Sequence, residues 1–217
     1  ISLTAFAHPA DISYLRVKVE RQRLEMRFTF NLLTLTRFVA VDGNDDKRID
    51  KAELDAAEPA LRRYLAEHIR VRINDQVATL GTPSPLVCLW PSPDTPPQAV
   101  EADYGQRHVD FVFAQEVKPF LEDVWLGFEI WQQTGPLGTV EATYEQEQMR
   151  TQVPFSQGEP DYLHDTGFTA EVAPPPIDPF AKPAEPKRLP LGLAIGIAGI
   201  LAVGLELWRR KRYGSRP

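Results

Sequence analysis

Residues 189–205 carry no charged side chain, and this run limits the fold of the chain more than any other feature. Roughly 20 predominantly apolar residues of an α-helix are needed to cross the hydrocarbon core of a bilayer. Trp208 stands where an aromatic side chain suits the lipid–water interface, and four consecutive basic residues follow it. A helix buried in a soluble core would not end in this way. The pattern therefore predicts a single helix over residues 191–208 that spans the lipid bilayer, and a basic tail over 209–217.

Basic residues are more numerous after this predicted helix than before it. Five follow it, and three precede it closely, namely Lys182, Lys187 and Arg188. An excess of Lys and Arg marks the cytoplasmic side of a membrane span. We therefore expect a single-pass protein of a bacterial inner membrane, with its C-terminus in the cytoplasm and its large N-terminal part in the periplasm.

Small residues line one face of the predicted membrane helix. Gly192 and Gly196 form a GxxxG motif, and Gly199 continues the same face. Such a face lets a second helix approach closely, because packing replaces the hydrophobic effect inside lipid. The motif predicts a partner that is itself an integral membrane protein. The alternative is that glycine is simply common in membrane helices.

A proline-rich stretch marks the end of the folded part. Residues 173–190 contain seven prolines in 18 positions, a composition that favours a semi-rigid polyproline II spacer. Near the start, residues 5–7 read Ala-Phe-Ala, the A-x-A pattern that ends a secretory signal peptide. We expect residues 1–7 to be the remnant of such a signal and residues 8–172 to form one extracytoplasmic domain, and cleavage after residue 7 stays open.

The charge of the chain is distributed unevenly. The net charge is −6 overall, but residues 1–181 carry −12 and the remainder carries +6. So acidic a domain does not bind nucleic acid through its bulk charge. The single cysteine, Cys88, excludes an intrachain disulfide. The sequence contains no nucleophile elbow, phosphate-binding loop or glycine-rich dinucleotide turn, so we expect no enzymatic activity.

The extracytoplasmic part has the alternating pattern of β-strands. Residues 12–20 and 23–30 each alternate apolar and polar side chains, and a short polar turn between them predicts a β-hairpin. Later short runs rich in aromatic and β-branched residues are separated by turn residues. We predict further strands at residues 69–73, 76–80, 108–113, 124–131, 139–144 and 151–155. The expected fold is mainly β, an antiparallel sandwich.

One region of this domain has helical periodicity instead. Residues 51–68 place apolar side chains at steps of three and four. Pro59 stands inside the region, so the sequence predicts a short helix ending near Ala57 and a second helix beginning at Pro59. Residues 28–41, which precede this region, show no clear helical pattern.

A twelve-residue acidic loop stands immediately before the helical region. Its spacing matches an EF-hand loop, in which calcium takes six to eight oxygen ligands from fixed positions. The matching residues, at positions 1, 3, 5, 7, 9 and 12, are Asp42, Asn44, Asp46, Arg48 through its backbone carbonyl, Asp50 and Glu53. The loop therefore predicts a calcium ion (Ca²⁺) as the cofactor.

The sixth position of this loop departs from the EF-hand pattern. It normally holds glycine for a sharp turn, and here it holds Lys47. A non-glycine residue in the left-handed conformation costs about 1 kcal/mol, and the ammonium adds a positive charge close to the ion. The alternative interpretation is an acidic turn that caps the following helix, with Glu53 near the positive end of the helix dipole.

The order of these motifs resembles a known family. The chain reads HPADISYL from residue 8, continues with paired strands, and then reads DGNDDKRIDKAELDAAEPALRRYLAEHIRVRIN. This is similar to the extracytoplasmic N-terminal region of HupE/UreJ-like bacterial membrane proteins over roughly residues 7–80. The resemblance implies the six calcium-loop positions already named. The polytopic part of that family, which is associated with nickel or cobalt uptake, has no counterpart here, so metal transport is not implied.

These features favour a structural role. We expect a non-catalytic, single-pass accessory or scaffolding subunit of a larger inner-membrane complex, for example a respiratory or photosynthetic one, with a structural calcium site. Its partners would contact both the membrane helix and the outer domain. The alternative is a freestanding, membrane-anchored periplasmic module that binds or senses a ligand in a calcium- or metal-dependent way.

Overall fold

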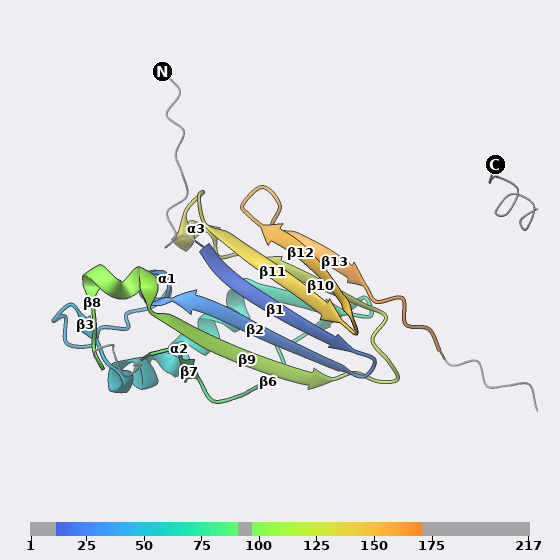
Figure 1. Cartoon of the computed structure of the whole chain (residues 1–217), viewed down its shortest axis with the longest axis horizontal. Coiled ribbons are helices and arrows are strands. Elements are labelled where there is room, and N and C mark those ends of the chain that lie inside the picture. The colour runs from blue at the N-terminus through green and yellow to red at the C-terminus, as the bar shows by residue number, and fades with distance from the viewer. Residues whose placement is uncertain (1–11, 91–96, 171–217) are drawn as a thin grey trace, which may run out of the picture. The chain divides into compact units, whose positions relative to one another are not determined.

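A computed structural model describes residues 12–90 and 97–170 (Figure 1). These residues belong to the first of two compact units, Ile1–Glu171, and the second is Val172–Pro217. The predicted signal remnant, stalk, membrane helix with its three glycines, and basic tail lie outside the described residues. Among the residues that are described, no helix is long and apolar enough to cross a membrane.

Two β-sheets form the body of the domain, so the prediction of a mainly β fold is confirmed. The larger sheet has the order β12-β11-β1-β2-β9-β6, with β7 also pairing with β9. Its strands are β1 (Ile12–Glu20), β2 (Arg23–Asn31), β6 (Thr82–Pro83), β7 (Val87–Cys88), β9 (His108–Glu116), β11 (Thr139–Gln146) and β12 (Met149–Phe155). The smaller sheet has the order β13-β10-β4-β5. Its strands are β4 (Ile69–Ile73), β5 (Gln76–Ala78), β10 (Asp123–Phe128) and β13 (Asp161–Asp165).

The predicted hairpin between β1 and β2 is confirmed, with Glu20 opposite Arg23 at the turn. Its alternation places Val17 and Val19 in the core, whereas Lys18 between them is exposed. A shift of one residue in this register would exchange the two faces. The strand predicted over residues 124–131 is shorter than expected, because Trp131 begins the short helix α3 (Trp131–Thr134).

One strand pair departs from the antiparallel prediction. Strand β1 pairs in parallel with β11, from Ile12 opposite Thr139 to Val19 opposite Gln146. Within the described residues, every other strand pair of the two sheets is antiparallel. The alternation in a strand specifies its buried face but not its neighbour, so the sequence pattern could not reveal this pairing.

Aromatic side chains fill the space between the two sheets. Phe28 of β2 is fully buried, and its ring packs edge-on against Phe128 of β10 with 6.3 Å between ring centroids. The Phe113 ring of β9 lies 6.0 Å from Phe28 in a second edge-on contact. Edge-on pairs at this separation are favourable beyond the burial of their area. Phe28 therefore joins the larger sheet to the smaller one.

Helix α2 is continuous over Lys51–His68, so the prediction of two helices separated at Pro59 is wrong. Pro59 removes one backbone hydrogen bond, but it lies on the exposed side of the helix, where water can satisfy the freed carbonyl. Leu54 and Leu61 on either side of it are fully buried. Their packing onto the core holds the helix in one piece across the proline.

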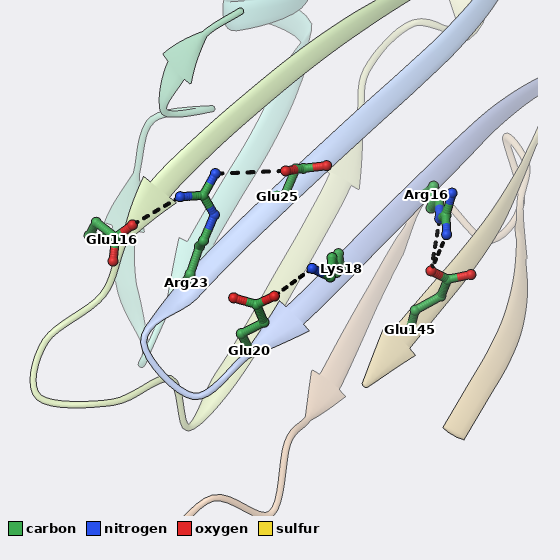
Figure 2. Close-up of polar contacts among 7 residues, drawn as sticks. All are labelled: Arg16, Lys18, Glu20, Arg23, Glu25, Glu116 and Glu145. Carbon is green, nitrogen blue, oxygen red and sulfur yellow. Dashed lines mark hydrogen bonds and ion pairs between the residues drawn. The ribbon is translucent and has the colours of Figure 1, made fainter. Parts of the chain in front are cut away.

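The outer face of the larger sheet carries charged side chains in pairs of opposite sign. Figure 2 shows Arg16 bound to Glu145, at 2.6 Å between Nη2 and Oε2, and Arg23 placed between Glu25 and Glu116. Arg16, Arg23 and Glu116 are largely exposed, whereas Glu25 and Glu145 are partly buried. Ion pairs with an exposed partner contribute little to stability. We interpret this face as a solvated surface.

Candidate functional site

The acidic loop over residues 42–53 joins two helices, and the first of them was not predicted from the sequence. Helix α1 (Leu32–Phe38) begins directly after β2, and Asn31 caps it by accepting a hydrogen bond from the Thr34 amide at 2.8 Å. The expectation that residues 28–41 lack a helix is therefore wrong for this segment. A helix of seven residues completes only two turns, which is too short for a clear periodic pattern.

Aromatic stacking fixes the angle at which the two helices enter and leave the loop. The Phe38 ring at the end of α1 stacks on Tyr64 of α2, with 4.4 Å between centroids. Tyr64 in turn stacks on His68 at 4.0 Å. The loop is thus held between two helices that pack on each other.

The side chains at the first, third and fifth positions fold the loop around Asp42. One Asp42 oxygen accepts the Lys47 amide at 2.8 Å, and the other accepts the Asp46 amide at 3.3 Å. The Asn44 side-chain oxygen also accepts the Asp46 amide, at 2.8 Å, and an Asp46 oxygen accepts the Arg48 amide at 2.8 Å. The three predicted ligands therefore share one ring of backbone hydrogen bonds.

Two non-glycine residues of this loop adopt the left-handed conformation. Asp45 has φ of 59° and Lys47 has φ of 60°. The turn expected at the sixth position is thus made by a residue with a side chain, at a cost of about 1 kcal/mol. The Lys47 ammonium pairs with Glu101, at 3.5 Å between Nζ and Oε2.

The ninth and twelfth positions close the loop onto helix α2. Asp50 accepts the Glu53 amide at 3.0 Å, and Glu53 accepts the Asp50 amide at 3.2 Å, which is a capping box. The other Glu53 oxygen accepts the Gly43 amide at 3.2 Å. Glu53 therefore links the start of the loop to its end.

The seventh position anchors the loop to another part of the chain. Strand β3 (Arg48–Ile49) pairs with β8 (Ala99–Val100), so that Arg48 lies opposite Val100. Ile49 is fully buried. This short pairing ties the loop to the segment that leads into β9.

All six predicted ligands are oxygen donors, the type that calcium requires. An ionised carboxylate has about four acceptor positions, so a carboxylate that accepts one or two amide hydrogen bonds keeps others for a cation. Over residues 12–90 and 97–170, no three His, Cys, Asp or Glu side chains stand close enough together to hold a metal ion in their present rotamers. Binding would therefore require side chains of the loop to turn inward.

Sequence reasoning did not single out Tyr104, a buried tyrosine in the segment that follows β8. Tyr104 belongs to the 3₁₀ helix η2 (Glu101–Gln106), is 5% exposed, and has a buried hydroxyl without a hydrogen-bond partner. Burial raises its pKa to about 12, with further contributions from nearby carboxylates of the loop, Asp42, Glu53 and Asp46, and from Glu101. Buried polar groups are rarely left unpaired, so this hydroxyl needs an explanation.

His164 is buried among side chains of the domain core. Its Nε2 lies 3.1 Å from the Gln146 side-chain oxygen, and its ring stacks on Tyr144 at 4.8 Å. Burial lowers the pKa of His164, an effect that Asp165 opposes. The folded protein therefore favours the neutral imidazole.

Protonation of His164 gives a pH-dependent stability. Because its folded pKa lies below the unfolded value of 6.5, its contribution is complete above pH 6.5 and declines as the pH falls below it. We expect a His164→Gln variant to lose less stability than the wild-type protein between pH 7.5 and pH 5. Urea unfolding of both proteins at several pH values measures this difference. Parallel pH profiles for the two proteins would contradict it.

Comparison with protein families gives no match for this chain, and comparison with curated proteins gives none either. The resemblance to the HupE/UreJ-like extracytoplasmic region therefore rests on the sequence motifs alone.

Proposed function

We propose that this chain is a non-catalytic accessory subunit of a bacterial inner-membrane complex, and that its outer domain holds a structural calcium ion in the loop over residues 42–53. The observation that carries the calcium part is the ring of hydrogen bonds that gathers Asp42, Asn44 and Asp46 between two packed helices. The accessory part rests on the predicted membrane helix and its glycines.

The loop is more elaborate than a helix cap requires. Capping α2 needs only the reciprocal hydrogen bonds of Asp50 and Glu53. The loop also places two non-glycine residues, Asp45 and Lys47, at positive φ. This conformation costs about 1 kcal/mol for Lys47, and less for Asp45 because aspartate adopts it more readily. A cation that draws the carboxylates together would offset this cost, whereas a cap alone leaves it without a purpose.

The loop and the last described segment lie at opposite ends of the domain. The loop and α1 lie at one end of the domain, where β2 ends and β9 begins (Figure 1). Segment 166–170 lies at the other end, where Arg21 of the β1–β2 turn donates to the Thr169 carbonyl at 2.6 Å.

The resemblance to HupE/UreJ-like proteins is compatible with this proposal. That resemblance implies a loop, a helix and a strand in succession, and α2 does lead directly into β4. We propose that the loop over residues 42–53 binds calcium, as the resemblance implies. The single predicted membrane helix would then serve as an anchor and a packing face.

Association with a larger complex is tested on solubilised membranes. We expect the native protein to migrate with a large complex on blue-native gels, and a Gly192→Leu/Gly196→Leu variant to dissociate from it, because bulky side chains keep helix backbones apart. An Ala194→Leu variant is the control, since residue 194 lies off the GxxxG face. Migration of the wild-type protein as a lone monomer would favour the freestanding calcium-dependent module instead.

A further inference from the structure

The smaller sheet ends at β13, and one edge of this strand has no neighbour among the residues that the structure describes. In an antiparallel pair, residues that exchange backbone hydrogen bonds with the neighbouring strand alternate with residues whose backbone groups point away from it. The Thr166 amide donates to the Glu122 carbonyl at 2.9 Å, which together with the register of β10 and β13 fixes this alternation. The backbone groups of Asp161, Leu163 and Asp165 therefore point to the open edge.

A cleft opens between the two sheets beside this edge. Strands β12 and β13 are consecutive in the chain and contact each other, although they belong to different sheets (Figure 1). Met149 and Thr151 of β12 share the inner face of the larger sheet with the buried Phe155, but both are exposed, because the smaller sheet ends at β13. They line a cleft of about 480 Å³ together with Tyr144, whose buried hydroxyl has no hydrogen-bond partner among the described residues. One more strand beside β13 would cover this cleft.

The side chains along the open edge are acidic, apolar and acidic in turn. Asp161, Leu163 and Asp165 are all exposed, and Leu163 is 56% exposed. Two copies of this chain paired antiparallel about Leu163 would place Asp161 of each copy opposite Asp165 of the other, and like charges in that position are destabilising. A strand with basic side chains at the two matching positions would be attracted instead. The edge therefore disfavours a second copy and favours a basic strand of another protein.

The other edge strands of the two sheets are less suited to accept a strand. A two-residue turn joins Gln146 to Met149, so the alternation of the β11–β12 pair directs the backbone of Pro154 away from β11. The proline ring stands at that open edge and provides no amide there. Strand β5 has only three residues, and β6 and β7 have two each, and such short strands resist pairing with other chains. Strand β13 has five residues and no proline.

We propose that β13 accepts an extended segment of a partner protein as a fifth strand of the smaller sheet, and that this segment carries a basic, an apolar and a basic side chain at alternate positions. The basic side chains pair with Asp161 and Asp165, and the apolar one packs on Leu163. The side chains between them enter the cleft beside Met149 and Tyr144. This inference rests on the proposed accessory role, whose partner contact on the outer domain it specifies, and it does not depend on the calcium loop.

A peptide with this pattern tests the inference on the full-length protein in detergent. The labelled peptide Thr-Lys-Val-Leu-Val-Lys-Thr places both lysines and the leucine on one face, and the control peptide has glutamate in place of both lysines. The lysine peptide should bind on the order of tenfold more tightly in fluorescence anisotropy, because two ion pairs replace two repulsions. An Asp161→Lys/Asp165→Lys variant should reverse this preference in favour of the glutamate peptide.

A proline at the centre of the edge tests the backbone pairing. Leu163→Pro removes an amide that points to the open edge and no hydrogen bond to β10, so it should abolish peptide binding while the sheet stays folded. Val77→Pro is the matched control on the opposite edge strand, where a two-residue turn joins Ile73 to Gln76 and the Val77 amide likewise points away from β4. It should leave peptide binding unchanged. Circular dichroism melts of both variants verify that they remain folded.

Equal binding of the two peptides by the wild-type protein would overturn the inference, and so would binding that survives Leu163→Pro. Dimerisation of the wild-type protein that Leu163→Pro abolishes would assign the edge to a second copy and overturn it as well. On blue-native gels, the Asp161→Lys/Asp165→Lys variant should dissociate from the larger complex. If it stays with the complex as the wild-type protein does, this inference fails and the accessory role stands. If the wild-type protein prefers the lysine peptide but migrates alone, the accessory role fails and strand addition at β13 stands.

Discussion

Millimolar calcium is expected to raise the melting temperature of the full-length protein in detergent by several degrees relative to a chelator. A ligand that binds only the folded state stabilises it by about 2.7 kcal/mol when its concentration is 100 times Kd. For a domain of this size, 1 kcal/mol shifts the melting temperature by about 2–4 °C. The expected increase is therefore about 5–11 °C. Circular dichroism melts in calcium and in chelator measure it.

Conservative changes in the loop should remove most of this increase. Asp42→Asn and Glu53→Gln each keep one oxygen that can accept a backbone amide, but each loses its second acceptor oxygen and the charge that calcium requires. The two variants should therefore melt slightly below the wild-type temperature in chelator, because each loses one backbone hydrogen bond, and they should gain little in calcium. Lys47→Gly should increase the gain, because it relieves the left-handed backbone and removes a positive charge. A wild-type melting temperature that is independent of calcium would leave the loop as a helix cap.

Replacement of Phe28 with alanine is expected to cost about 3–5 kcal/mol of folding free energy, the range for a buried phenylalanine reduced to alanine. Phe28 is fully buried and contacts rings of both sheets. The cavity left by its ring therefore cannot be closed by a movement of one strand. At about 2–4 °C per kcal/mol, the melting temperature should fall by roughly 6–20 °C.

Two further substitutions calibrate the effect at Phe28. Phe28→Leu retains much of the apolar volume and should cost less than alanine. Val77→Ala changes a side chain that is 90% exposed and should stay within about 0.5 kcal/mol of the wild-type protein. Denaturant unfolding of the three variants gives the comparison. A Phe28→Ala variant as stable as Val77→Ala would mean that the two sheets do not share this core.

Local patterns were sufficient to predict the β1–β2 hairpin and the location of helix α2. The hairpin follows from alternation on both sides of a polar turn, and α2 follows from apolar steps of three and four. The turn at Asn74 and Asp75, which both have positive φ, is equally local. In each case the decisive residues lie within a few positions of one another.

Features that depend on distant residues could not be predicted in this way. Pro59 is tolerated inside α2 because Leu54 and Leu61 are buried by other elements, which the helical pattern does not record. The candidate site illustrates the same limit. The spacing from Asp42 to Glu53 is visible in the sequence, but Glu101 reaches Lys47 of the loop only through the pairing of β3 with β8.

The parallel pairing of β1 with β11 has a consequence for the synthesis of this chain. Strand β1 lies in the middle of the larger sheet, between β2 and β11, so one of its edges stays open until residues 139–146 have been made. At ribosomal rates of about 5–20 residues per second, that interval is on the order of ten seconds. Such long-range pairing also slows folding itself. A nascent chain with an exposed, alternating strand edge is prone to pair with other chains, so this edge of β1 is a site of aggregation until β11 has been synthesised.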